Sequence, residues 1–248
     1  MSFYAIILAA GKGKRMRDEN TPAEFPKVLK QVNGRPLVSY VIDTLKASGI
    51  DDITIIVGFG ADYVKNALGS GFRFVTQKEQ LGSGHAVAIA KDALADYTGH
   101  VIIMCGDSPL FRKETISALK NQHLESGAVI TLVSAELADP TGYGRIKRLP
   151  SGEIAGVVEE KCASPEEKTI KEINGGAYAF NSAWLWSNID KIERNEANEF
   201  NLTYLVSVAV SQGQKVEAVQ AAPEEVMGVN TTEDLQRVEG ILLKRSGR

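Results

Sequence analysis

Short runs of apolar, mostly β-branched residues alternate with segments of helical periodicity through the first half of the chain. This alternation restricts the possible folds more than any other feature. The runs are short and end at turn residues, which is typical of buried strands. We expect strands at residues 4–10, 53–57, 72–76 and 101–105, and helices at residues 36–47, 61–68, 83–94 and 112–124. Strands and helices that alternate in this way form a mainly parallel sheet with helices on both faces.

The pattern changes after residue 128, where strands begin to follow one another directly. We expect strands at residues 128–135, 145–149, 154–158, 173–180 and 215–220, and helices at residues 183–189, 202–210 and 232–243. The turn Pro150-Ser151-Gly152 joins two of these strands as a hairpin. No linker or internal repeat divides the chain. The sequence therefore predicts one doubly wound, Rossmann-like α/β domain over residues 1–248, with a mainly parallel mixed sheet and added antiparallel strands in the second half.

Composition narrows the class of protein. A net charge of −3 argues against general affinity for nucleic acid. No apolar run approaches the length of a membrane span, and the N-terminus lacks the basic leader of a signal peptide. The two cysteines, Cys105 and Cys162, form neither a zinc motif nor a disulfide framework. We expect a cytoplasmic protein that binds small molecules.

A glycine-rich turn, Gly11-Lys12-Gly13, follows the first expected strand. Such a turn lets backbone N–H groups approach phosphate oxygens, but a surface turn with solvated lysines is an alternative reading. The segment from residue 12 to residue 30 carries a local excess of positive charge in an acidic protein, from Lys12, Lys14, Arg15, Arg17, Lys27 and Lys30 against Asp18, Glu19 and Glu24. This basic segment favours an anionic small substrate.

Polar residues near the ends of expected strands and helices are further candidates for binding residues, and each could instead have a purely structural role. Asp107 follows a buried strand at the carboxyl edge of the sheet, where ligands bind, but it also opens an Asp-Ser-Pro turn. Ser83 is a candidate helix cap, and Asn230 lies at the capped start of the last helix. We interpret His85 as a structural histidine, and Glu159 could be a solvated strand end.

Eight motifs, the first of them in two parts, resemble a known family and follow its order. Leu8–Met16 (LAAGKGKRM) and Pro26-Lys27-Val28-Leu29 resemble the signature of sugar nucleotidyltransferases. The others resemble the uridylyltransferase domain of bifunctional N-acetylglucosamine-1-phosphate uridylyltransferase/glucosamine-1-phosphate acetyltransferases. They are the segments at residues 77–86, 106–110, 142–146, 158–161, 172–176, 199–203 and 228–230.

This resemblance implies a nucleotide-diphospho-sugar transferase fold and a reaction. UMP would pass from UTP to N-acetylglucosamine 1-phosphate by in-line attack on the α-phosphate, with Mg²⁺ as cofactor. The first half, residues 1–125, would bind the nucleotide, and residues 126–248 the sugar. The implied catalytic residues are Arg15 and Lys27, and the implied metal ligands are Asp107 and Asn230. The implied nucleotide-binding residues are Leu8, Ala9, Ala10, Gly11, Lys12, Gly13, Gln77, Gln80, Gly82 and Ser83. The implied sugar-binding residues are Gly144, Glu159 and Asn174.

Two alternatives remain open at this stage. One is a nucleotidyltransferase for another sugar 1-phosphate, such as glucose 1-phosphate or N-acetylgalactosamine 1-phosphate, or for another nucleotide. The other is an inactive regulatory subunit that binds nucleotide sugars. Lys14, Cys162 and Gly175 depart from the family pattern, and the last two bear on sugar identity. Because hexapeptide repeats are missing, we expect no acetyltransferase half in this chain; its oligomeric state is open.

Overall fold

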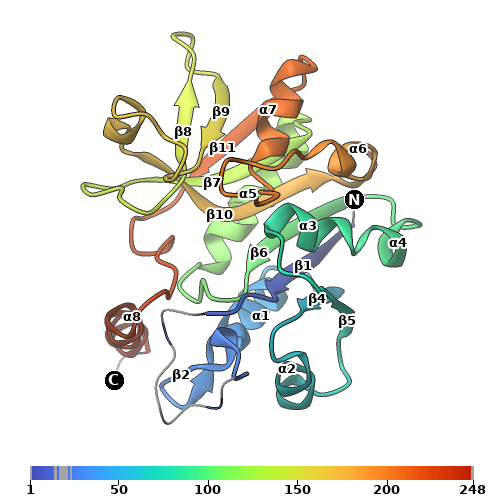
Figure 1. The fold of residues 1–248 in the computed structure, drawn as a ribbon, viewed down its shortest axis with the longest axis vertical. Helices are drawn as coiled ribbons and strands as arrows, with labels where there is room; N and C mark the ends of the chain where they lie inside the picture. The colour runs from blue at the N-terminus through green and yellow to red at the C-terminus, as the bar shows by residue number, and fades with distance from the viewer. Residues whose placement is uncertain (1, 14–15, 17–21, 23, 247–248) are drawn as a thin grey trace.

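A computed structural model describes residues 2–13, 16, 22 and 24–246, and shows a mixed α/β fold built around one large sheet (Figure 1). The strands are β1 (Phe3–Ala9), β2 (Gln31–Val32), β3 (Arg35–Pro36), β4 (Ile53–Val57), β5 (Arg73–Thr76), β6 (His100–Cys105), β7 (Ile130–Glu136), β8 (Arg145–Arg148), β9 (Ile154–Val158), β10 (Glu172–Asn181) and β11 (Val216–Gln220). The α-helices are α1 (Leu37–Ala47), α2 (Ala61–Leu68), α3 (Ser83–Ala88), α4 (Lys91–Leu94), α5 (Lys113–Ser126), α6 (Ser182–Asn188), α7 (Tyr204–Ser211) and α8 (Thr232–Arg245). Short 3-10 helices are η2 (Lys27–Leu29), η3 (Glu167–Thr169) and η4 (Ile189–Lys191).

The order of strands in the sheet confirms the expected fold class. The main path runs β11-β7-β10-β6-β1-β4-β5. Strands β6, β1, β4 and β5 pair in parallel, as do β11 and β7. Strand β10 is antiparallel to both β6 and β7, and it also carries the β8–β9 hairpin. The antiparallel additions therefore belong to the second half, as predicted.

Helices cover both faces of the sheet, because alternate strand residues point to opposite sides. On β1, Ile7 enters a core shared with α1, α2 and α5, whereas Ile6 enters a core shared with α3, α4, α6 and α7. Both side chains are fully buried. This doubly wound arrangement leaves the carboxyl ends of the parallel strands free of helices, which is where such folds bind ligands.

One local expectation was wrong, and one element was missed. The helix expected over residues 83–94 is two helices, α3 and α4, because the N–H of Ala90 bonds to the carbonyl of Val87, three residues back instead of four. The short β2–β3 hairpin was not predicted. Its turn, Asn33-Gly34, has positive φ at both residues, 50° and 74°.

The last helix returns to the first half of the chain (Figure 1). Helix α8 lies beside β2, and its Val238 joins a small core with Val32 and Leu37. The Glu239 carboxylate also accepts a hydrogen bond from the N–H of Asn33, 3.1 Å away. This return places the segment before α8 next to the carboxyl end of β6. In the part of the chain that the structure describes, no helix combines the length and the apolar character needed to cross a membrane.

Candidate active site

A pocket of about 360 Å³ opens at the carboxyl ends of β1, β5 and β6. It is lined by Leu8, Ala10, Gly11, Gly13, Lys27, Val28, Gln77, Gln80, Gly82, Ser83, Ala86, Cys105, Asp107, Glu199 and Asn201. Most residues predicted to bind nucleotide therefore meet in one place. Two do not line it: Ala9 points into the core on the opposite face, and Lys12 is exposed. Arg15 and Lys14 lie outside the described residues.

The glycine loop lies tightly against the Lys27 segment. Gly13 has φ of 54°, and a Cβ at this position would stand 2.8 Å from Cβ of Lys27. A side chain here would displace Lys27, so glycine is required for the close approach. A Cβ at Gly11, by contrast, would meet nothing within 4 Å. The loop thus presents open backbone on its pocket side.

A single ammonium group joins three parts of the chain at the pocket wall. Lys27 forms an ion pair with Asp107, and its Nζ donates a hydrogen bond to Oδ1 of Asn230 at 3.1 Å. Asp107 and Asn230 come from distant segments, yet their oxygens converge on one positive charge. The two predicted metal ligands and the predicted catalytic lysine therefore form one cluster.

The segment before α8 holds Asn230 in this position. The N–H of Val229 donates to the carbonyl of Asp107 at 3.0 Å, which ties the segment to the turn after β6. The cap of α8 is Thr231, whose hydroxyl forms a capping box with Asp234. The sequence left open whether Asn230 caps α8, and the residue whose side chain caps this helix is its neighbour Thr231. The Asn230 side chain is thus available to the site.

Gln77 is positioned on the opposite side of the pocket by two acceptors. It is only 3% exposed. Its Nε2 lies 3.2 Å from the carbonyl of Gly82 and 3.0 Å from Nδ1 of His85. Gln80, which also lines the pocket, holds the backbone of Gln77, because its own Nε2 donates to the Gln77 carbonyl at 3.0 Å. A buried amide with a fixed orientation can read the hydrogen-bonding edge of a base.

The turn after Gln77 packs directly on the chain near Phe200. Gly82 has φ of 116°, and a Cβ there would stand 2.4 Å from the Phe200 carbonyl oxygen. Ser83 does not cap α3; its hydroxyl oxygen accepts a hydrogen bond from the N–H of Leu202 at 2.9 Å. The structural alternative for Ser83, a helix cap, is therefore excluded, and its hydroxyl hydrogen is not used by this bond.

The predicted sugar-binding residues come together beside β10. The N–H of Asn174 donates to the Gly144 carbonyl at 2.9 Å, and a Cβ on Gly144 would lie 3.5 Å from the Glu159 carboxylate. Glu159 is not a free strand end, because it accepts a hydrogen bond of 2.5 Å from the hydroxyl of buried Thr203. The Asn174 amide donates to the hydroxyl of Tyr178 at 2.6 Å.

Cys105 and Tyr178 both lie within electrostatic reach of Glu159 in the sugar cluster. Burial raises the pKa of the Cys105 thiol to about 12; Asp107 and Glu159 raise it further, and Lys27 opposes them. Burial likewise raises the pKa of Tyr178, and Glu159 adds to that effect. Cys105, which lines the pocket, is thus neutral and within electrostatic reach of both carboxylates. The pocket lining itself includes none of the three predicted sugar-binding residues.

Gly175 follows Asn174 where the family pattern often has threonine. A Cβ at Gly175 would stand 2.9 Å from the carbonyl oxygen of Val133 and 2.8 Å from Val226. The pairing of β10 with β7 is irregular between Asn174 and Tyr178. Packing against β7 therefore accounts for the glycine, and a bulge of this kind can redirect the Asn174 side chain.

Arg145 is a residue whose role the sequence did not reveal. It is 1% exposed, and its guanidinium bonds to the Tyr143 carbonyl and lies 2.7 Å from the Glu160 carboxylate. Glu160 also accepts from the N–H of Gly142 at 3.2 Å. Arg145 thus fastens the turn before Gly144 to the segment that carries Glu159. Its motif neighbours were noticed in the sequence, but an isolated arginine gives no signal of burial.

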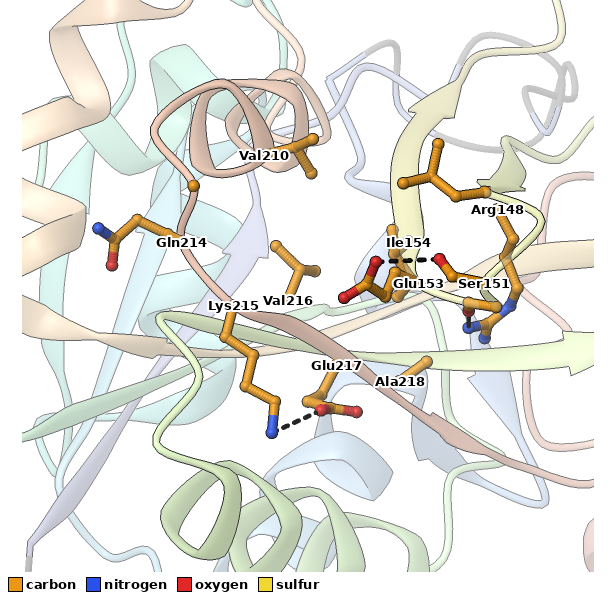
Figure 2. Close-up of a pocket in the computed structure, with 13 residues that line it drawn as sticks. Arg148, Ser151, Glu153, Ile154, Val210, Gln214, Lys215, Val216, Glu217 and Ala218 are labelled. Carbon is orange, nitrogen blue, oxygen red and sulfur yellow. Dashed lines mark hydrogen bonds and ion pairs between the residues drawn. The ribbon is translucent and has the colours of Figure 1, made fainter.

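A larger hollow of about 650 Å³ lies elsewhere, between the β8–β9 hairpin and β11 (Figure 2). Figure 2 shows charged and polar side chains of its wall paired with one another: Lys215 with Glu217 at 3.0 Å, and Ser151 with Glu153 at 2.9 Å. No residue predicted to bind substrate is among its lining residues. The smaller pocket is therefore the candidate active site.

Comparison with known proteins shows the family to which the chain is related. The profile of the nucleotidyl transferase family matches residues 4–225. The chain is 42% identical over 244 residues to the bifunctional protein GlmU of Halalkalibacterium halodurans, covering 98% of this chain and 52% of that protein. It is 40% identical over 247 residues to the bifunctional protein GlmU of Clostridioides difficile, covering 99% and 52%. The chain thus spans about half the length of these curated relatives.

A solved structure shares the fold. A Bacillus anthracis protein described as a glucose-1-phosphate thymidylyltransferase, crystallised with sucrose, superposes with a TM-score of 0.78. The match covers 97% of this chain and 95% of the other, at 20% sequence identity. At that identity the likeness concerns the fold alone.

Proposed function

The chain belongs to the nucleotidyl transferase family, and we propose that it transfers UMP from UTP to N-acetylglucosamine 1-phosphate and releases pyrophosphate. One observation carries the proposal: Lys27, Asp107 and Asn230 converge beside a glycine loop, with a fixed base-reading glutamine opposite. Neutral ligands would not require this concentration of charge. The whole-chain match to bifunctional GlmU proteins supports the choice of reaction.

The reaction brings two anions together. A phosphate oxygen of the sugar phosphate attacks the α-phosphorus of UTP, and the bond from that phosphorus to the pyrophosphate oxygen breaks. The nucleophile is already an anion, so no general base is needed. The protein contributes positioning and neutralisation of charge. Lys27 neutralises the triphosphate, and the backbone of the Gly11–Gly13 loop donates hydrogen bonds to it. Arg15 would add a second cation.

The metal would be Mg²⁺, held by Asp107 and Asn230. Both present hard oxygen donors, and both already contact one cationic group, the Lys27 ammonium. No cluster of three or more His, Cys, Asp or Glu side chains suited to a metal occurs in the described ranges. Mg²⁺ commonly uses only one or two protein oxygens together with substrate phosphates and water, so this donor set fits. The ion would supply additional neutralisation of the phosphates.

The sugar would lie over β8 and β10. Glu159 would accept hydrogen bonds from sugar hydroxyls, and Asn174 would pair with the hydroxyl or acetamido groups. The backbone N–H of Gly144 would also be available as a donor. Because Glu159 is itself held by Thr203, it would offer a fixed acceptor. We also propose that the protein works in the cytoplasm, because free Cys105 and Cys162 suit a reducing compartment.

A panel of nucleotides and sugar phosphates tests the proposal. Pyrophosphate release is measured with UTP, CTP and dTTP, each with N-acetylglucosamine 1-phosphate or glucose 1-phosphate, with and without Mg²⁺. We expect the highest kcat/KM for UTP with N-acetylglucosamine 1-phosphate, and no turnover with excess chelator. Higher kcat/KM with glucose 1-phosphate would reassign the sugar. No turnover with any pair would favour the regulatory subunit.

A further inference from the structure

His85 does not line the candidate active site, yet it contacts Gln77, the residue predicted to bind the nucleotide base. Its Nδ1 lies 3.0 Å from Nε2 of Gln77. The ring packs near Phe200, with centroids 6.4 Å apart, beside a separate small cavity that also touches Ile192. His85 therefore acts from behind the pocket wall.

The two contacts of Gln77 fix which end of its amide faces inward. The Gly82 carbonyl can only accept a hydrogen bond, so the amide end 3.2 Å from it must be the NH₂ group. The same NH₂ group lies 3.0 Å from Nδ1 of His85, which must then be the unprotonated, accepting nitrogen of the ring. Both bonds use Nε2, and neither engages the amide oxygen Oε1.

We propose that His85 is a positioning residue that sets the nucleotide base preference by holding Gln77 with its amide oxygen available to the base. This inference rests on the proposed function, because it specifies how that site chooses its nucleotide. His85 and Gly82 take both hydrogens of the Gln77 NH₂ group. The Gln77 side chain therefore offers a bound base only a hydrogen-bond acceptor, the amide oxygen Oε1.

An acceptor that faces N3 of the bound base distinguishes the two pyrimidines. Uracil carries a hydrogen at N3 and can donate it to Oε1 of Gln77. Cytosine has a lone pair at N3, which would face the lone pairs of the same oxygen. Without His85, one of the two restraints on the amide is lost, and Gln77 can turn its NH₂ group toward the base. Sites with fixed polar groups reject a mismatched partner because those groups are left unpaired.

The test compares UTP with CTP in the full chain and in three variants. His85→Phe keeps an aromatic ring beside Phe200 but removes the acceptor, and His85→Asn returns an acceptor oxygen near the position of Nδ1. Ile192→Val, the matched control, loosens the packing of the same small cavity and leaves Gln77 untouched. For each protein, kcat/KM is measured with both nucleotides at a fixed concentration of N-acetylglucosamine 1-phosphate, together with a thermal melt.

We expect the UTP-to-CTP ratio of kcat/KM to fall at least tenfold in His85→Phe, to recover most of that loss in His85→Asn, and to remain within twofold of the parent in Ile192→Val. An unchanged ratio in folded His85→Phe, or an equal fall in Ile192→Val, overturns the inference. If His85→Phe does not fold, His85→Leu carries the same test. A parent that does not use UTP refutes the proposed function instead, before any variant is compared.

Discussion

Replacing Asp107 with asparagine separates a role in turnover from a role in folding. The substitution keeps the size of the side chain and removes the charge that faces Lys27. Asp107 and Lys27 are partly exposed, with side-chain exposures of 21% and 13%. Two unit charges about 4 Å apart near a protein surface attract by about 4 kcal/mol, but hydration of the separated groups returns most of that energy. Asn230 remains as a partner for the ammonium.

We therefore expect a net loss of about 1 kcal/mol of stability in Asp107→Asn, which corresponds to a fall in Tm of about 2–4 °C for a chain of this size. Turnover should fall much further. Loss of one preorganised electrostatic group typically lowers kcat by about 10²–10³, which corresponds to about 3–4 kcal/mol. The site lies at a sheet edge, so the core packing should not change.

The assay is pyrophosphate release against Mg²⁺ concentration, paired with thermal melts. Asp43→Asn is the matched control, because Asp43 forms an exposed ion pair with Arg35 in the same half of the chain, outside the pocket. It should leave kcat within twofold of the parent. Near-normal turnover by folded Asp107→Asn would refute the reasoning, as would an equal loss in Asp43→Asn.

Three further predictions test other parts of the structure. Asn230→Ala should lower kcat at least tenfold with little change in Tm. Thr231→Ala should lower stability by about 1 kcal/mol through loss of the α8 cap and leave kcat nearly unchanged. Kinetics and thermal melts of both variants test this, and the reverse pattern would contradict the roles assigned to the two residues. Arg145→Lys should raise KM for the sugar phosphate at least fivefold and KM for UTP less than twofold, because it loosens the link to Glu160; equal changes in both constants would argue for a general structural effect. Burial, with His100 nearby, lowers the pKa of His123 to about 4, so the unfolded chain binds more protons between that value and about 6.5. The contribution of His123 to the free energy of unfolding should be complete above pH 6.5 and fall by up to about 3 kcal/mol toward pH 4. Urea titrations at several pH values should show this dependence on pH in the parent and a weaker one in His123→Gln. The same dependence in both proteins would exclude His123 as its source.

The local sequence predicted helices and strands well where turn residues flank a periodic segment. The expected strands at residues 53–57 and 154–158 and the helix at residues 61–68 match β4, β9 and α2. The β2–β3 hairpin was missed although its Asn33-Gly34 turn is a strong hairpin signal. The single domain over residues 1–248 stays a prediction.

The candidate site was predictable in its residues but not in its contacts. Family motifs indicated Lys27, Asp107 and Asn230, but no local pattern says that one ammonium contacts the other two side chains. Ser83 shows the limit most clearly. A serine at a helix start favours a cap, but its hydroxyl instead accepts from Leu202, a partner 119 positions away. Tertiary packing excluded the cap, and the base-binding role that the family implies for Ser83 stays a prediction.

The packing of α8 and its preceding segment against the first half of the chain has a consequence for the nascent chain on the ribosome. The hydrogen bond from Lys27 to Asn230 spans 203 positions, so at roughly 5–20 residues per second the second partner is synthesised about 10–40 s after the first. The turn after β6 is made well before that moment, and Lys27 can already meet Asp107. A nascent chain can therefore bring Lys27 and Asp107 together early, but the asparagine that completes the charged cluster arrives only as synthesis reaches the last helix.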